Sequence, residues 1–282
     1  MSSYKSTANL SVGFIESAFR MLIWRCLPTY RQNINHPRPP VAGPENANAA
    51  AAIVMFMTAL DYHLCRLKYL RDVAKHNPSS FDSPYFNWAF DFDEPLGKKL
   101  ETFLMHRKER SLLKRLIELT VCRDTVVHPK FYTITYAMNQ DLSYKKIKAE
   151  LAPGVTLREK TKRHKLKRQE FTRLLRLPVV PTWISYVDAV ICILVLHRLL
   201  NLLEARCGNP YAWVGTMTAY EKETKELFVG WNWKQNHPNK MENWVEAFYN
   251  SLSTEDQEKV KRALGNNWSV YLKPQHSPFK LT

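Results

Sequence analysis

The chain has 282 residues, of which 45% are hydrophobic and 24% are charged; this is the composition of a globular protein and excludes a wholly disordered chain. Forty-one Lys and Arg against 26 Asp and Glu give a net charge of +15, so a polyanion such as RNA, DNA or an anionic membrane surface is the expected partner. The eight glycines are scattered, which excludes the glycine-rich phosphate-binding loops of nucleotide-binding proteins.

The first residues and the cysteines indicate a cytoplasmic protein without a membrane span. Met1–Ser11 is polar and lacks the apolar region of a secretory signal. The five cysteines are odd in number and form no C-x-x-C pair, so we expect reduced thiols and no structural metal site. The most apolar stretch, Val187–Leu203, contains Asp188, His197 and Arg198. It therefore predicts a buried core helix and not a membrane span.

Three helices are predicted in the first half of the chain, because apolar residues recur three or four positions apart. They are placed at Val12–Leu27, from Glu45 to Asn77 and at about Leu96–Val126. Arg31–Pro44 holds four prolines, which cannot continue a helix and break the first from the second. An aromatic loop at Pro78–Pro95 separates the second from the third. The core-facing residues of the third helix are expected at Leu113, Leu116, Ile117 and Thr120.

The pattern changes after Pro129. Phe131–Tyr136 is β-branched and aromatic and predicts a strand, with a partner strand near Leu142–Ile147. A fourth helix is expected from Pro181, a favoured first-turn residue, to about Arg206.

The tail is unlike the rest, because it holds five of the eight tryptophans. One helix is expected at Met241–Ser251, and another after a Ser253 N-cap with Asp256 three residues on. We therefore expect a mainly α fold in three parts: an N-terminal helix with a proline-rich linker at residues 1–44, a helical bundle at 45–207 with an insertion at about 130–178, and a Trp-rich extension at 208–282.

A strongly basic run covers Leu157–Leu177, where nine Lys and Arg stand against two Glu. Such cations bind phosphates without regard to base sequence, and unpaired bases stack on nearby rings, here those of Tyr136, Tyr144 and Phe171. The residues expected to contact RNA are Arg158, Lys160, Lys162, Arg163, Lys165, Lys167, Arg168 and Arg173. A solvated charged face is the simpler interpretation. A membrane-surface role is a further alternative, because the apolar residues of the run gather at its C-terminal end.

The end of the third predicted helix carries the motif Arg123-Asp124-x-x-x-His128. It resembles the HEPN family, a family of all-α bundles of which many are ribonucleases. The family signature is Arg, a polar residue, three residues and His. The resemblance covers about residues 45–207. It implies a bundle whose catalytic residues are Arg123, Asp124 and His128, with two protomers of a homodimer forming one composite site. Such proteins often act as toxins or phage-defence effectors, which makes an antitoxin or a sensor protein a candidate partner.

The motif suits RNA cleavage without a metal ion or cofactor. RNA supplies its own nucleophile, the 2′-OH; histidine transfers protons near neutral pH, and arginine stays charged and binds two phosphate oxygens. Asp124 is expected to orient His128 or Arg123, or to hold the interface. The first hypothesis is thus a metal-independent endoribonuclease. The alternatives are a HEPN-like module that binds RNA or dimerises without catalysis, and a helical interaction protein whose basic loop binds nucleic acid incidentally.

Two other Arg–His pairs share the spacing, Arg31–His36 and Arg71–His76. The first is expected to lie in the proline-rich break. We prefer Arg123–His128, because Val126 and Val127 supply apolar packing just before the histidine and helices precede and follow it. Pro129 disfavours helical conformation at His128, which lets the imidazole approach Arg123.

Other clusters of ionisable residues have simpler interpretations. Asp91, Asp93 and Glu94 are interpreted as a solvated acidic loop and not as the metal site of a nuclease. His63 and Cys65 are interpreted as core or boundary residues of a helix and not as metal ligands.

Overall fold

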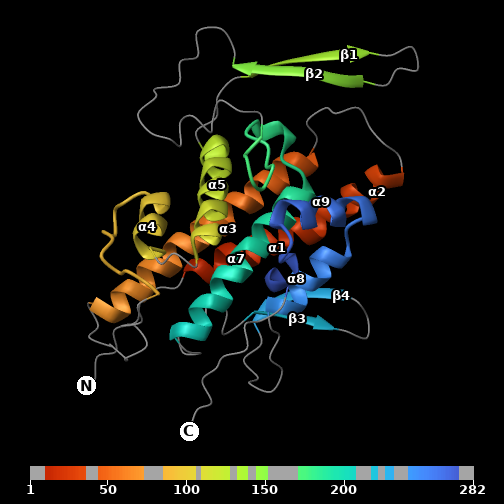
Figure 1. Cartoon of the computed structure of the whole chain (residues 1–282). Coiled ribbons are helices and arrows are strands. Elements are labelled where there is room, and N and C mark those ends of the chain that lie inside the picture. Colours follow the sequence, from red (N-terminus) through yellow and green to blue (C-terminus); the bar gives the residue numbers. More distant parts are fainter. Residues whose placement is uncertain are drawn as a thin grey trace.

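The computed structural model describes residues 10–35, 44–72, 85–105, 109–127, 132–138, 144–151, 171–207, 217–221, 226–231 and 241–272. The protein is mainly helical, as expected (Figure 1). The helical elements are α1 (Leu10–Met21), the π-helical turn η1 (Leu22–Cys26), α2 (Leu27–Asn35), α3 (Pro44–Asp72), α4 (Leu96–Phe103), α5 (Arg110–Val127), the 3-10 turn η4 (Pro181–Trp183), α7 (Tyr186–Cys207), α8 (Met241–Asn250), α9 (Thr254–Leu264) and the 3-10 turn η6 (Trp268–Tyr271).

Two pairs of antiparallel strands accompany the helices. The pair β1 (Tyr132–Met138) and β2 (Tyr144–Leu151) has a register shift between Thr135 and Tyr136. Both strands overlap the two segments for which strands were expected. The pair β3 (Met217–Glu221) and β4 (Glu226–Trp231) lies in the tail, where no strands were expected.

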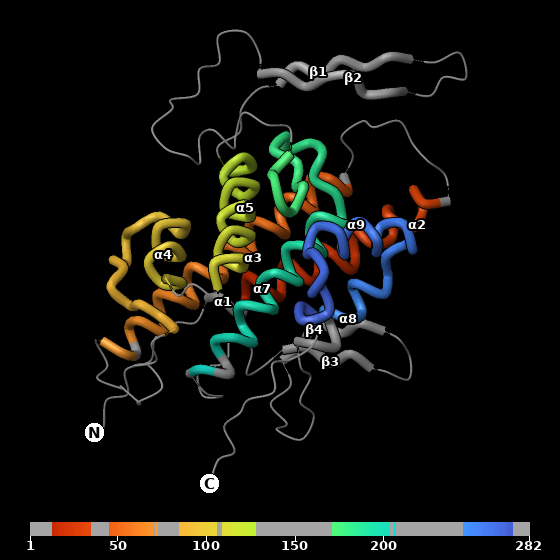
Figure 2. Tube along the Cα trace, in the orientation of Figure 1, coloured from red at the N-terminus to blue at the C-terminus, as the bar shows by residue number. Residues whose placement is uncertain are grey.

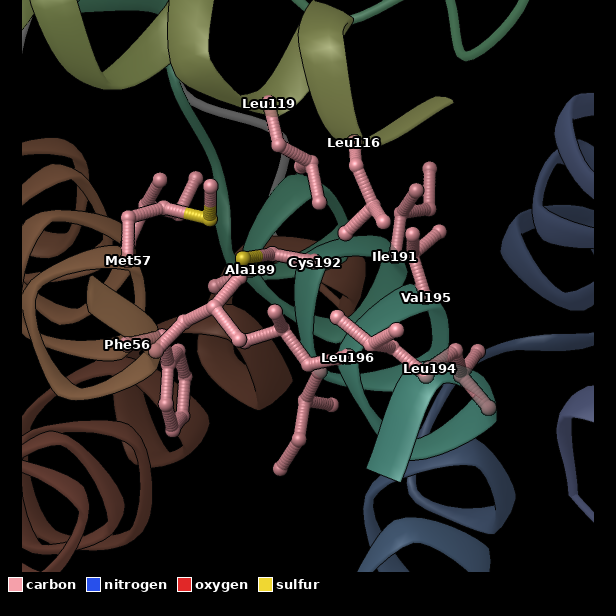
Figure 3. Close-up of a cluster of buried hydrophobic side chains, with 14 of the residues drawn as sticks. Phe56, Met57, Leu116, Leu119, Ala189, Ile191, Cys192, Leu194, Val195 and Leu196 are labelled. Atoms are coloured by element: carbon pink, nitrogen blue, oxygen red, sulfur yellow. The ribbon is translucent and has the colours of Figure 1, made fainter. Parts of the chain in front are cut away.

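Helix α7 forms the centre of the core. Its residues from Ala189 to Leu196 are all apolar and all buried, which is typical of a helix enclosed by others. Figure 3 shows where side chains of α3, α5 and α7 meet, among them Phe56, Met57, Leu116, Leu119, Ala189, Cys192 and Leu196. Within the described residues, Glu45–Tyr69 and Tyr186–Leu203 are long and apolar enough to cross a membrane, but 89% of the second stretch is buried inside the protein. That burial fits the expected core helix.

Both ends of the described chain pack on this same core. Figure 2 shows the blue helices α8 and α9 beside α7 and α2. The Tyr30 hydroxyl of α2 donates to the Asp256 carboxylate of α9 at 2.6 Å. His197 Nδ1–H of α7 donates to the carbonyl oxygen of Tyr271 at 2.6 Å, because a carbonyl can only accept. The boundaries expected at residues 44 and 208 therefore do not divide the hydrophobic core.

The third predicted helix is two helices in the structure. Leu104 leaves helical conformation after α4, with φ −100° and ψ 52°. The carbonyl of Phe103 accepts a hydrogen bond from the Asn87 N–H of the aromatic loop at 3.0 Å, and the ring of Phe103 stacks on Phe86 with centroids 4.5 Å apart. The loop thus occupies the end of α4, and α5 begins separately at Arg110.

The buried face of α5 also differs from the expected one. Leu116 and Thr120 are buried as expected, but Leu113 and Ile117 are only half-buried, and Leu112, Leu119 and Cys122 are buried as well. The cause is polar anchoring, because Arg115 and Glu118 point inwards. Arg115 Nη2 donates to the Leu264 carbonyl at 2.9 Å, which ties the tail to α5.

Two helix boundaries differ from the predicted ones: the end of the first helical segment and the start of α7. The first helical segment continues through η1 and α2 to Asn35, although α2 contains Pro28; Arg31 is therefore helical. Pro181 begins only the short turn η4. Helix α7 starts after Ser185, whose N–H donates to the Asp188 carboxylate at 2.7 Å, half of a capping box. The predicted Ser253 cap is confirmed, since its hydroxyl accepts from the Asp256 N–H.

Candidate functional site

Arg123 and Asp124 lie near the C-terminal end of α5 and form an ion pair. Arg123 Nη1 is 2.9 Å from Asp124 Oδ1, and the two side chains are 27% and 26% exposed. Arg123 Nε is buried and has no hydrogen-bond partner among the described residues. The third residue of the motif, His128, lies outside the described residues, so the full motif stays a prediction.

The helix turns this pair away from the core because its neighbours are buried. Cys122 and Thr125 on either side are enclosed, and the Thr125 hydroxyl donates to the Cys122 carbonyl at 2.7 Å. Burial raises the pKa of the Cys122 thiol well above its ordinary value, so this residue is neutral. Val127, one helical turn beyond Arg123, is 41% exposed. The end of α5 thus presents a guanidinium, a carboxylate and an apolar side chain.

The second Arg-Asp pair has similar geometry but a different environment. Arg71 Nη1 is 2.8 Å from Asp72 Oδ1 at the end of α3. Lys68 Nζ also binds this carboxylate, at 2.6 Å. Asp72 is therefore shared by two cations. His76 lies outside the described residues, as does His36.

Most of the basic run lies outside the described residues, including every cation from Arg158 to Arg168. The C-terminal end of the run is described, and it packs against the hydrophobic core. Leu175 and Leu177 are buried in the hydrophobic core, whereas Arg173 and Arg176 are exposed. Leucines of this end, which motivated the membrane-surface alternative, are thus core residues.

Glu118 of α5 holds this end of the run. Its carboxylate accepts hydrogen bonds from the Leu174 N–H at 2.9 and 3.1 Å and from the Leu175 N–H at 2.8 Å. The side chain is buried, so three charge-assisted contacts compensate its desolvation. Sequence reasoning missed this residue, because a lone Glu in a helix is usually solvated. The signal was its position between Leu116 and Leu119, both buried.

Two aromatic rings and a guanidinium stack beside this anchor. Phe171 and Trp183 have centroids 6.1 Å apart with 29° between their planes. The Arg176 guanidinium lies over the Phe171 ring, 5.5 Å from its centroid. Arg176 has φ 56°, the left-handed region that non-glycine residues rarely adopt. Sequence reasoning included Phe171 but missed Trp183 and Arg176 as its partners.

The remaining candidates do not form a metal site. Asp91 and Asp93 are exposed, as expected for a solvated loop, whereas the Glu94 side chain is only 15% exposed and pairs with Lys98. His63 is wholly buried, and burial lowers its pKa to about 3, as expected for a core residue. Among the described residues, no group of three or more His, Cys, Asp or Glu is arranged to hold a metal ion. The cysteines described in full are free thiols: Cys26, Cys65, Cys122 and Cys192.

Comparison with known proteins adds no relative. No protein-family model matches the chain, and no curated protein or solved structure matches it. Its function has to be argued from its own residues.

Proposed function

We propose that the protein is a metal-independent endoribonuclease of HEPN type that acts at the C-terminal end of α5. The observation that carries the proposal is the half-exposed Arg123–Asp124 ion pair on a core-packed helix of a mainly helical protein. The net charge of +15 supports a polyanionic substrate. A HEPN-like module that binds RNA without cutting it is the alternative.

Arg123 and His128 have separate chemical tasks in this proposal. Arg123 binds the non-bridging oxygens of the scissile phosphate and offsets the charge that grows on them. His128 takes the proton of the 2′-OH, whose oxygen then bonds to phosphorus. The bond from phosphorus to the 5′-oxygen breaks, and that oxygen receives a proton from the His128 of a second copy. The products are a 2′,3′-cyclic phosphate and a 5′-OH.

A homodimer belongs to the proposal, because one motif supplies only one histidine. Val127 supports an interface at this point, since it is 41% exposed and lies one turn from Arg123 on the same side of α5. Val127→Asp is expected to shift the protein from dimer to monomer in analytical ultracentrifugation and to abolish cleavage. A wild-type monomer that cuts RNA would contradict the composite site. An antitoxin or a sensor protein as a further partner is part of the same proposal.

Incubation of the purified protein with total RNA in EDTA tests the activity. Wild type is expected to cut and to leave 2′,3′-cyclic phosphate ends, and His128→Ala to lose about 10²- to 10⁴-fold in rate. Arg123→Ala is expected to lose most of the rate as well. The matched control replaces both Arg71 and His76 with Ala and should cut normally. The catalytic proposal fails if wild type cuts nothing, or if the control is dead while the Arg123 and His128 variants are active.

A further inference from the structure

The loop at residues 171–183, called here the basic loop, is held together by its own hydrogen bonds and packs on the hydrophobic core. The Thr172 N–H donates to the Leu177 carbonyl at 2.8 Å, and the Leu177 N–H donates to the Thr172 hydroxyl at 3.0 Å. Phe171 and Pro178 form an isolated bridge across its base. With Thr172, Leu175 and Leu177 buried, the loop has a core side and an outer side.

The outer side carries cations and half-buried rings. Arg173 and Arg176 are exposed, and Phe171 and Trp183 are half-buried. Residues 171–183 contain no Asp or Glu. The loop therefore presents two positive charges around a stacked pair of rings. Single-stranded nucleic acid is bound by this combination, because bases stack on rings and on guanidinium planes while cations contact phosphates.

Arg176 adds a sign of functional constraint. Its left-handed backbone is unfavourable for a residue with a Cβ, and glycine would adopt it without that cost. An arginine at this position places its guanidinium over the Phe171 ring. The strain is thus associated with the cation–ring stack.

The basic loop lies on the helix that carries the candidate catalytic pair. Glu118 binds Leu174 and Leu175 to α5, five residues before Arg123, and η4 contacts α5 as well. Figure 1 shows the green loop beside α5. The cations expected to bind RNA between Arg158 and Arg168 come shortly before Phe171 in the sequence.

We propose that Phe171, Trp183 and Arg176 bind an unpaired nucleotide of single-stranded RNA, with Arg173 contacting a neighbouring phosphate. Glu118 is the positioning residue, because it fixes this platform relative to Arg123. The naming of RNA as the ligand rests on the proposed function, whereas the stacking surface itself does not require cleavage.

An oligonucleotide that cannot be cut separates binding from catalysis. The probe is fluorescein-labelled 2′-O-methyl oligoadenosine of about 12 nucleotides, within the length that such grooves cover; its blocked 2′-oxygen cannot attack. Fluorescence anisotropy is expected to show that Trp183→Ala and Phe171→Ala raise the Kd about 5- to 150-fold, the value of one lost base stack. Annealing the probe to its complement is expected to weaken binding, because paired bases cannot stack on the platform.

Two further variants protect the test against misfolding. Arg176→Gly removes the guanidinium at a backbone position that glycine favours, so it should fold at least as well as wild type and still bind more weakly. The matched control is Phe92→Ala, because Phe92 is an exposed ring that also lies under a cation, Lys68 at 5.6 Å. It should bind the probe as wild type does.

The outcomes distinguish the platform from the enzyme. The platform is overturned if wild type does not bind the probe, or if Trp183→Ala and Arg176→Gly bind it within twofold of wild type. In that case cleavage in EDTA can still stand. If the platform variants lose binding while wild type cuts no RNA, the platform stands and the proposed endoribonuclease fails.

Discussion

Two loops of the protein each place an aromatic ring next to a cation. One is the end of the aromatic loop at residues 85–95, called here the acidic loop, and the other is the basic loop at 171–183. Lys68 Nζ lies 5.6 Å from the Phe92 centroid in the first, and the Arg176 guanidinium lies 5.5 Å from the Phe171 centroid in the second. Their burial differs. In the acidic loop most rings face inwards, since Phe86, Trp88 and Phe90 are buried. In the basic loop leucines face inwards and the rings are left half-exposed.

Charge separates the two loops as clearly as burial does. Residues 85–95 contain three carboxylates and no Lys or Arg, whereas residues 171–183 contain two Arg and no carboxylate. The acidic loop would repel a polyanion that the basic loop attracts. The difference teaches that aromatic content alone does not locate a binding surface; the side chains that occupy the core decide which groups are left for a ligand.

The largest expected effect is the loss of stability when the buried tryptophan of the acidic loop is replaced, compared with the same replacement in the basic loop. Trp88→Ala removes a buried ring that packs on Phe103 with centroids 4.8 Å apart, and should lower the free energy of unfolding by about 3–5 kcal/mol. Trp183→Ala should cost clearly less stability but weaken RNA binding. Urea unfolding and anisotropy on the same preparations measure both effects. If Trp88→Ala, where folded, binds RNA as weakly as Trp183→Ala, the separation of roles is wrong.

The second largest effect is the difference in stability loss between Glu118→Ala, which affects the basic loop, and Glu94→Ala, which affects the acidic loop. Glu118→Ala leaves the N–H groups of the half-buried Leu174 and the buried Leu175 without their carboxylate, at a cost of about 1–3 kcal/mol. Hydrogen exchange of these two amides should accelerate. The control is Glu94→Ala, which removes an ion pair with the exposed Lys98; ion pairs of exposed lysines contribute little to stability. Equal stability losses in the two variants would contradict the anchoring role of Glu118.

Two buried ionisable groups, His63 on α3 and Asp188 on α7, should change the free energy of unfolding with pH in opposite directions. Burial lowers the pKa of His63 on α3 from 6.5 to about 3, so only the unfolded chain binds this proton in between and stability falls as pH drops through that window. Burial raises the pKa of Asp188 on α7 from 3.8 to about 6, so the folded chain holds a proton that the unfolded chain releases. Its contribution to stability is lost as pH rises through that window.

Urea unfolding between pH 4 and 6 checks these signs. His63→Met should make the free energy of unfolding rise less steeply with pH than in wild type. Asp188→Asn, which retains an oxygen to accept the Ser185 hydrogen bonds, should make it rise more steeply. A shift of both slopes in the same direction would show that one of the two groups is not buried in the charge state described.

Local patterns predicted much of the fold, and long-range contacts account for what they missed. The spacing of apolar residues placed α3, the apolar stretch Val187–Leu203 placed the core of α7, and the Ser253 hydroxyl placed the start of α9. The break between α4 and α5 was missed because its cause, the Asn87 N–H on the Phe103 carbonyl, comes from another part of the chain. The spacing of apolar residues within one helix carries no information about a contact from a distant loop.

The candidate site divides in the same way. Arg123 and Asp124 are adjacent in sequence, so a motif predicted them together, and their ion pair is local. Glu118 was missed because its partners, the amides of Leu174 and Leu175, are backbone groups that leave no mark in the pattern of side chains. Trp183 was missed because it meets Phe171 only through the turn of the basic loop.

The smallest expected effect is on the salt dependence of RNA binding. Arg173→Ala should reduce the slope of log K against log salt by about one, the value of one phosphate contact. Asp93→Ala on the acidic loop should leave the slope unchanged. This slope is measured by titrating each variant with the 2′-O-methyl probe at several salt concentrations. An unchanged slope for Arg173→Ala would remove this arginine from the binding surface.

The most direct test of where RNA binds is photocross-linking with peptide mapping. Single-stranded RNA containing 4-thiouridine is bound to the Arg123→Ala variant, irradiated, and the modified peptides are identified by mass spectrometry. We expect cross-links to Phe171 or Trp183 of the basic loop, and none to Phe92 of the acidic loop, although Phe92 is 45% exposed. Cross-links on the acidic loop, or their absence from residues 171–183 while RNA is bound elsewhere, would contradict the assignment of the RNA site to the end of α5.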